Sequence, residues 1–134
     1  AFAELKGNFH FTFKSHPNYV VNAETFHLKR CEFESNSLEE IIFDFDVIVS
    51  GSTTGAAVDA YIVGRPLVIL LDAKELNFSP LRRFKDVIFV NSARELEGVI
   101  ANKGFKKILN NKKRDFYYFN ESYPKWKKIL LEID

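Results

Sequence analysis

The sequence predicts an α/β fold in which a parallel sheet carries helices on both faces. Four short apolar runs bounded by polar or turn residues predict buried strands at 9–13, 46–50, 66–71 and 87–90, and a weaker run predicts another at 26–33. Helical patterns lie between these runs. Strands that alternate with helices at this spacing pair in parallel and are covered on both sides, so we expect a Rossmann-like domain.

Two of the helices are predicted by capping boxes. Ser37 with Glu40, and Ser92 with Glu95, place a serine before a helix and a glutamate three residues on, so each side chain satisfies a free backbone amide. Three further helices are expected, at 54–63, 104–111 and 123–132. Residues 110–114 are the candidate linker, which joins the last two helices.

Length and composition indicate one domain, residues 1–134, large enough to bury a core without disulfides. No run approaches the ~20 apolar residues that span a bilayer, and no signal peptide is apparent, so we expect a cytoplasmic location. Cys31 is the only cysteine, which excludes an internal disulfide, and we expect it to be a small buried residue. The absence of methionine and the abrupt start predict a piece excised from a longer protein.

Charge is unevenly distributed along the chain. From Lys103 to the end there are nine Lys or Arg and four Asp or Glu, interleaved with aromatic residues. Such a tail is a candidate for peripheral contact with an anionic membrane surface, whereas nucleic acid is not an expected partner. The other interpretation is a helical end with aromatic residues packed inward and solvated lysines.

The loop after the strand at 46–50 predicts an anion site. Gly51, Ser52, Thr53 and Thr54 lead into a helix rich in small residues, so free amides and hydroxyl donors gather at the positive end of a helix dipole. Gly51 is expected to allow a tight turn. The spacing does not match a Walker loop, a dinucleotide fingerprint or a nucleophile elbow. The alternative is a simple helix cap, since Ser and Thr are favoured there.

Other polar residues complete the predicted site. Asp59, in the second turn of that helix, is a candidate acceptor for a ribose or sugar hydroxyl. After the first strand, Lys14 and His16 are candidate phosphate ligands, and His16 is also a candidate proton donor. Arg82 and Arg83 would add a phosphate fork. No cluster with metal-ligand spacing is present, and no cofactor is expected.

These motifs resemble the C-terminal domain of GT-B fold transferases that build bacterial surface polymers: CDP-glycerol glycerophosphotransferases, capsule polysaccharide transferases and polysialyltransferases. The resemblance covers residues 9–92, and four motifs in order carry it: Lys14-Ser15-His16-Pro17, Thr53-Thr54, Asp59 and Gly64-Arg65-Pro66. It implies one half of a GT-B fold, with His16 and the threonine pair on the donor's phosphates and Asp59 near the nucleotide's sugar. The implied donor is CMP-, CDP- or UDP-linked.

The resemblance also implies a missing N-terminal domain that supplies the acceptor site and the general base, so the isolated domain would bind but not catalyse. The site would stabilise the charge of a departing nucleotide. Three alternatives remain open: half of a nucleotide-sugar epimerase, a non-catalytic docking module that uses the basic tail, and a hydrolase with His16, Ser52 and Asp59.

Overall fold

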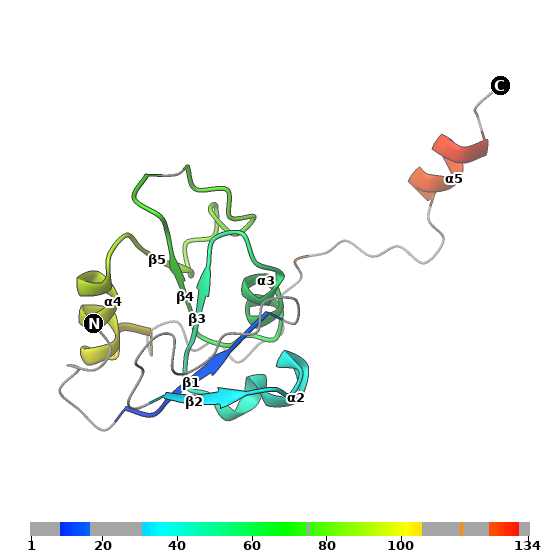
Figure 1. Cartoon of the computed structure of the whole chain (residues 1–134). Helices are drawn as coiled ribbons and strands as arrows, with labels where there is room; N and C mark the ends of the chain where they lie inside the picture. The colour runs from blue at the N-terminus through cyan, green and yellow to red at the C-terminus, as the bar shows by residue number, and fades with distance from the viewer. Residues whose placement is uncertain (1–8, 17–30, 75, 106–115, 117–123, 132–134) are drawn as a thin grey trace.

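The computed structural model describes residues 9–16, 31–74, 76–105, 116 and 124–131 of the chain (Figure 1). Its strands are β1 (Phe11–Lys14), β2 (Cys31–Glu34), β3 (Ile48–Gly51), β4 (Leu67–Leu70) and β5 (Ile88–Val90). Its helices are α2 (Leu38–Ile41), the 3-10 turn η2 (Ile42–Asp44), α3 (Gly55–Ile62), α4 (Ala93–Ala101) and α5 (Pro124–Leu131).

All four strands predicted from the main apolar runs are present, with ends shifted by at most two residues. Of the weaker predicted strand, 31–33 belongs to β2 and 26–30 lies outside the described residues. The helix predicted at 104–111 begins with a 3-10 conformation at 104–105, and its remainder and the candidate linker also lie outside them.

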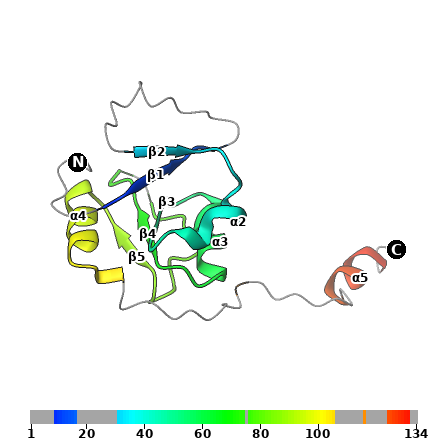
Figure 2. The same cartoon turned by 90° about the horizontal axis from the view of Figure 1, so that it is seen from below.

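The strands are parallel, as predicted, but they form two small sheets. One has the order β3-β4-β5, and the other pairs β1 with β2. The expectation of one sheet is therefore wrong for the described residues. Phe9 and Phe11 pack against the cluster that Val68 forms with Leu96 and Ile100 of α4, and β1 pairs with β2. Figure 2 shows β1 and β2 beyond β3, next to that edge of the larger sheet.

Helices cover both faces of the three-stranded sheet, as predicted. In β4, successive side chains point to opposite faces. Leu67 and Ile69 share a cluster with the buried side of α3, whereas Val68 shares the other with Leu96 and Ile100 of α4. All three β4 residues are buried, because the strand is central and both of its faces are covered.

The helix ends follow the predicted caps. Ser37 N–H donates to Glu40 Oε2 at 3.0 Å at the start of α2. At α4, Glu95 N–H donates to Ser92 Oγ at 3.2 Å, while Glu95 Oε2 accepts from Asn91 N–H at 2.8 Å, one residue before the expected partner. Beyond α3, Gly64 has φ 78°, the left-handed conformation that lets a helix end sharply. None of the helices in the described part of the chain could cross a membrane.

Candidate functional site

The turn between β3 and α3 joins the carboxyl end of a sheet strand to the amino end of a helix. Ser52 and Thr53 form the turn, Thr54 is the N-cap, and α3 begins at Gly55. Ala57 and Ala60 of α3 are fully buried against the sheet. Their small side chains allow close packing, so the helix start is held firmly at the sheet edge (Figure 1).

Thr54 turns its hydroxyl back to the strand. Thr54 Oγ1 lies 2.5 Å from Ser50 Oγ and 3.4 Å from the carbonyl oxygen of Gly51. Although its backbone has the extended conformation of an N-cap, its side chain makes no capping hydrogen bond. Among the described residues, no side chain therefore accepts from the free amides of the first turn of α3.

The amino end of α3 is exposed and carries no acidic residue that would repel an anion. Thr53, Thr54 and Gly55 are exposed and Ser52 is half-buried. A Cβ placed on Gly55 would meet nothing within 4 Å, and the first turn of α3 holds no acidic residue. Unpaired amides, the helix dipole and two neighbouring hydroxyls therefore give this turn the chemistry of an anion site.

The prediction that Gly51 makes a tight turn is wrong. Gly51 is the last residue of β3 and pairs in register with Leu70. Among the described glycines only Gly64 has a positive φ, and a Cβ on Gly51 would make an ordinary contact of 3.8 Å with Thr54. The turn needs no special backbone at this position because the strand runs one residue further than its apolar run indicates.

Asp59 lies one helical turn after Gly55, on the same side of α3. Its carboxylate is exposed and makes no hydrogen bond or ion pair with another described residue; its backbone carbonyl accepts from Val63 N–H at 3.1 Å. The carboxylate is thus accessible from solvent near the amino end of the helix. Its contact with a sugar hydroxyl stays a prediction.

The predicted ligands Lys14 and His16 lie at the end of β1. β1 belongs to the other sheet, and in Figure 1 it ends below the β3–α3 turn at the top of β3. Lys14 Nζ donates to the carbonyl of Ser15 at 3.2 Å. His16 is exposed and forms an isolated β-bridge. The contact of His16 with a phosphate near the threonine pair stays a prediction.

Arg82 and Arg83 occupy a turn in the β4–β5 connection, and both are exposed. Arg82 Nη1 donates to the carbonyl of Ser79 at 3.3 Å. The next residue, Phe84, has its ring centroid 4.8 Å from that of Tyr61, which lies in the last turn of α3. The arginine pair therefore lies next in the sequence to a residue that contacts the carboxyl end of α3. Along the helix axis, Tyr61 is about 9 Å from Gly55, the first residue of α3.

Arg65, from the Gly64-Arg65-Pro66 motif, connects two segments of the backbone by hydrogen bonds. Its guanidinium donates to the carbonyl of Phe45 and its backbone N–H donates to the carbonyl of Ala60 at 2.9 Å. These bonds fasten the end of α3 to the segment before β3. Arg65 therefore helps to position the β3–α3 turn without lying in it.

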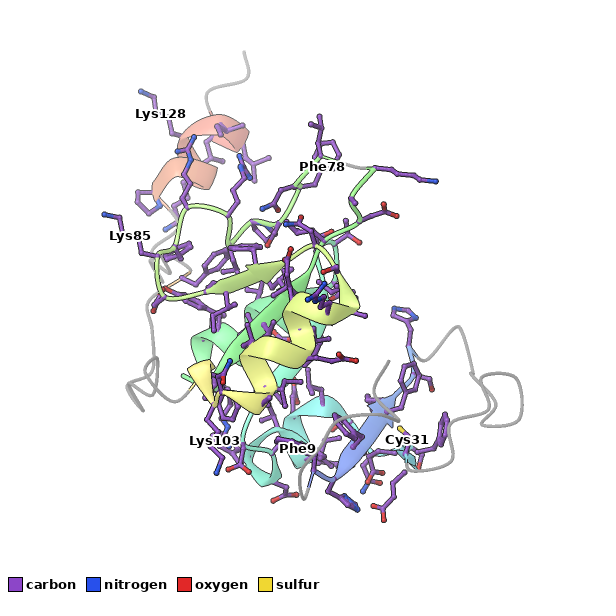
Figure 3. The ribbon with its side chains drawn as sticks, turned by 90° about the vertical axis from the view of Figure 1, so that its left-hand side faces the viewer. Phe9, Cys31, Phe78, Lys85, Lys103 and Lys128 are labelled. Atoms are coloured by element: carbon purple, nitrogen blue, oxygen red, sulfur yellow. The ribbon has the colours of Figure 1, made fainter. Side chains whose placement is uncertain are left out.

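Sequence reasoning missed two features near the carboxyl edge of the sheet. One is Ser50, which was predicted only as a strand residue and is the hydroxyl partner of Thr54. The signal in the sequence is a polar residue at the end of an apolar run. The other is the pair Leu76 and Phe78 in the loop after β4, which are 76% and 65% exposed. Figure 3 shows Phe78 projecting from that loop, away from the core. Large apolar residues beside the turn residue Asn77 are the signal there.

A shallow depression of about 470 Å³ lies elsewhere, between β5 and α4. It is lined by Ile88, Phe89, Val90, Glu95, Gly98, Val99 and Asn102. Its only charged residue is Glu95, whose carboxylate already accepts from Asn91 N–H. None of the predicted site residues lines it.

Cys31 is half-buried, not buried as expected, because it begins a strand of the two-stranded sheet. Burial raises the pKa of its thiol, the charge of Glu32 adds to the rise, and a hydrogen bond with the Phe13 backbone lowers it in part. A raised pKa keeps the thiol protonated, which does not suit a nucleophile. In the described part of the chain, no three His, Cys, Asp or Glu side chains gather as a metal site would require.

Comparison with known proteins found no matching protein family, no similar curated protein and no similar solved structure.

Proposed function

We propose that the β3–α3 turn binds a phosphate group of a nucleotide-activated donor. The observation that carries the proposal is the open amino end of α3: its amides lack a side-chain acceptor because the Thr54 hydroxyl bonds to Ser50. An anion is the partner that such an end favours, since both the free N–H groups and the helix dipole attract negative charge.

The proposed roles follow from position. The hydroxyls of Ser52 and Thr53 donate to phosphate oxygens together with the first amides of α3, and Asp59 accepts from a hydroxyl of the attached sugar. Bound in this way, the phosphate exchanges water for fixed dipoles, which also stabilise the charge that develops when a nucleotide departs.

By its resemblance to GT-B surface-polymer transferases, the chain would be the donor-binding, Rossmann-like half of a glycosyltransferase or glycerophosphotransferase. The donor would then be CMP-, CDP- or UDP-linked, and a second domain would supply the acceptor site. Lys14 and His16 lie at the end of a strand of the two-stranded sheet, and Arg82 and Arg83 precede Phe84, which contacts Tyr61 near the carboxyl end of α3. Their proposed contact with the donor rests on the resemblance and on residue type alone.

A titration with nucleotides tests the proposal. We would follow backbone amide signals by NMR while adding CMP, CDP, UDP, GDP or AMP, and measure the melting temperature in parallel. The amides of 53–57 should shift first, and a ligand at ~100 times its dissociation constant should stabilise the fold by roughly 2.7 kcal/mol. The nucleotide that binds best identifies the donor's base.

Three variants assign the contacts. Thr53→Ala should weaken binding, whereas Ser35→Ala, which removes an exposed hydroxyl in the β2–α2 connection, should leave it unchanged. His16→Ala tests the role that the resemblance implies. Binding that moves amides near β5 but not near Thr53 would refute the proposed site, and a lack of response to every nucleotide at millimolar concentration would refute nucleotide binding by this chain.

A further inference from the structure

Helix α5 is amphipathic and basic. It spans Pro124–Leu131, and proline at the first position of a helix is favourable because its missing N–H would be unpaired there. Positions 126, 129 and 130, which hold Trp, Ile and Leu, recur at the spacing of one helix face. Lysines occupy positions 125 and 127, on the flanks of that face, and position 128, on the opposite side of the helix.

Three apolar residues of α5 are left uncovered by the described part of the protein: Ile129 and Leu130 on that face, and Leu131 on the opposite side. Ile129, Leu130 and Leu131 are 58%, 65% and 76% exposed, and none belongs to either core cluster. Figures 1 and 2 show α5 standing apart from both sheets in two perpendicular views. A helix that belongs to a globular core normally buries such a face, so the face of α5 is available for a partner.

Charge indicates the kind of partner. No Asp or Glu lies within α5, Lys127 and Lys128 are exposed, and Figure 3 shows Lys128 extending from the helix. The flanking lysines would meet anionic headgroups while the face between them meets acyl chains. A nucleic acid would use the lysines but not the apolar residues, so one partner accounts for both features: an anionic lipid surface.

We propose that α5 is an interfacial helix that lies in the plane of a membrane containing anionic lipids. Eight residues form a helix about 12 Å long, too short to cross the ~30 Å hydrocarbon core, so the helix rests on the membrane. Each lysine near such a surface strengthens binding roughly fivefold, and binding weakens as salt screens the charge. Lipid binding by α5 needs no nucleotide and is separate from the phosphate site.

The chain offers an internal reporter for this proposal. Trp126 is its only tryptophan, so tryptophan fluorescence, excited selectively over that of tyrosine, reports on α5 alone. We would add vesicles of phosphatidylcholine, or of phosphatidylcholine with roughly one third phosphatidylglycerol. The emission should shift to the blue with the anionic vesicles and very little with the neutral ones. Brominated acyl chains in the anionic vesicles should quench it, and added salt should reverse the shift.

Variants separate the contributions of lysine charge and of the apolar face to vesicle binding. The double change Lys127→Gln with Lys128→Gln should weaken vesicle binding about 25-fold, and Leu130→Asp should remove the blue shift. The matched control changes Lys74 and Lys85 to Gln, two exposed lysines outside α5, and should alter binding little. All of these positions are exposed, so the melting temperature should stay close to that of the wild type.

Several results would overturn the proposal. Emission that is already blue-shifted without vesicles would mean that the protein itself covers the helix face. Equal binding by the α5 lysine variant and its control would remove the specific role of these lysines. A shift with a DNA duplex but not with anionic vesicles would favour a nucleic-acid surface instead.

Discussion

The Thr54 hydroxyl lies 2.5 Å from the hydroxyl of Ser50, across the turn that joins β3 to α3. The bond ties the N-cap residue of the helix to the strand before it. Because the same oxygen would otherwise be placed to cap α3, the bond leaves the amides of the first helical turn open to an external acceptor. This arrangement distinguishes the amino end of α3 from that of a helix whose N-cap side chain accepts from its first amides.

The open end of α3 makes a pair of substitutions at Gly55 informative. A side chain fits there, since a Cβ would meet nothing within 4 Å. Gly55→Asp should stabilise α3 by ~0.3–1 kcal/mol through the helix dipole, yet weaken nucleotide binding at least roughly fivefold by repelling the phosphate. Gly55→Ala should stabilise the fold by ~0.4–1 kcal/mol and retain binding. Thermal melts and calorimetric titration measure both effects, and equal affinity of the two variants would argue against a phosphate at this helix end.

Gly64, which follows α3, and Gly98, which lies within α4, should respond to alanine in opposite ways. Gly64 has φ 78°, so Gly64→Ala should destabilise the protein by ~1–2 kcal/mol, the cost of a side chain in the left-handed region. Gly98 lies within α4 with open space around its Cα, so Gly98→Ala should stabilise by ~0.5–1 kcal/mol. Urea unfolding measures both, and a loss of stability at Gly98 would show that the depression beside β5 needs the glycine.

Two leucines in the β4–β5 connection have contrasting environments. Leu81 is fully buried and packs in the same cluster as α3, so Leu81→Ala should cost ~2–5 kcal/mol through lost contacts and the cavity left behind. Leu76 is 76% exposed, and Leu76→Ala should change stability by less than ~0.5 kcal/mol. Guanidinium unfolding curves compare them; similar losses at both positions would mean that Leu76 has a partner in the folded protein.

The thiol of Cys31 should react slowly. Burial and the charge of Glu32 raise its pKa, so at about pH 8 less thiolate is present in the folded protein than in the unfolded chain. Reaction with Ellman's reagent should therefore be slower without urea than with it, and should accelerate only at higher pH. Glu32→Gln should speed the reaction, whereas Glu39→Gln, an exposed change on α2, should not. A folded rate equal to the unfolded one would contradict the raised pKa.

The sequence predicted those parts of the fold that depend on neighbours along the chain. The Ser92 and Glu95 box marks the start of α4, and Gly64 marks the end of α3, because each acts within three or four residues. The turn of Ser52 and Thr53 was also found from the chain alone, as a polar run between a strand and a helix. The sequence did not predict that the amides after this turn lack a side-chain acceptor, since Ser and Thr are favoured helix caps.

Other features depended on residues far apart in the sequence. The sequence does not show that Phe84 packs against Tyr61 near the carboxyl end of α3, or that Ile129 and Leu130 of α5 stay uncovered by the described residues. Each of these outcomes depends on which surfaces meet after the backbone has folded.

The sequence by itself thus determined where strands and helices occur, that the strands are parallel, and which residues surround the β3–α3 turn. Only the tertiary structure decided that β1 pairs with β2 in a sheet separate from the one that carries the β3–α3 turn. The physical reason is that apolar periodicity specifies which face of a strand is buried but not which edge it pairs with. In the folded protein β1 pairs with β2, while Phe9 and Phe11 pack against the cluster that Val68 and Val90 form with α4.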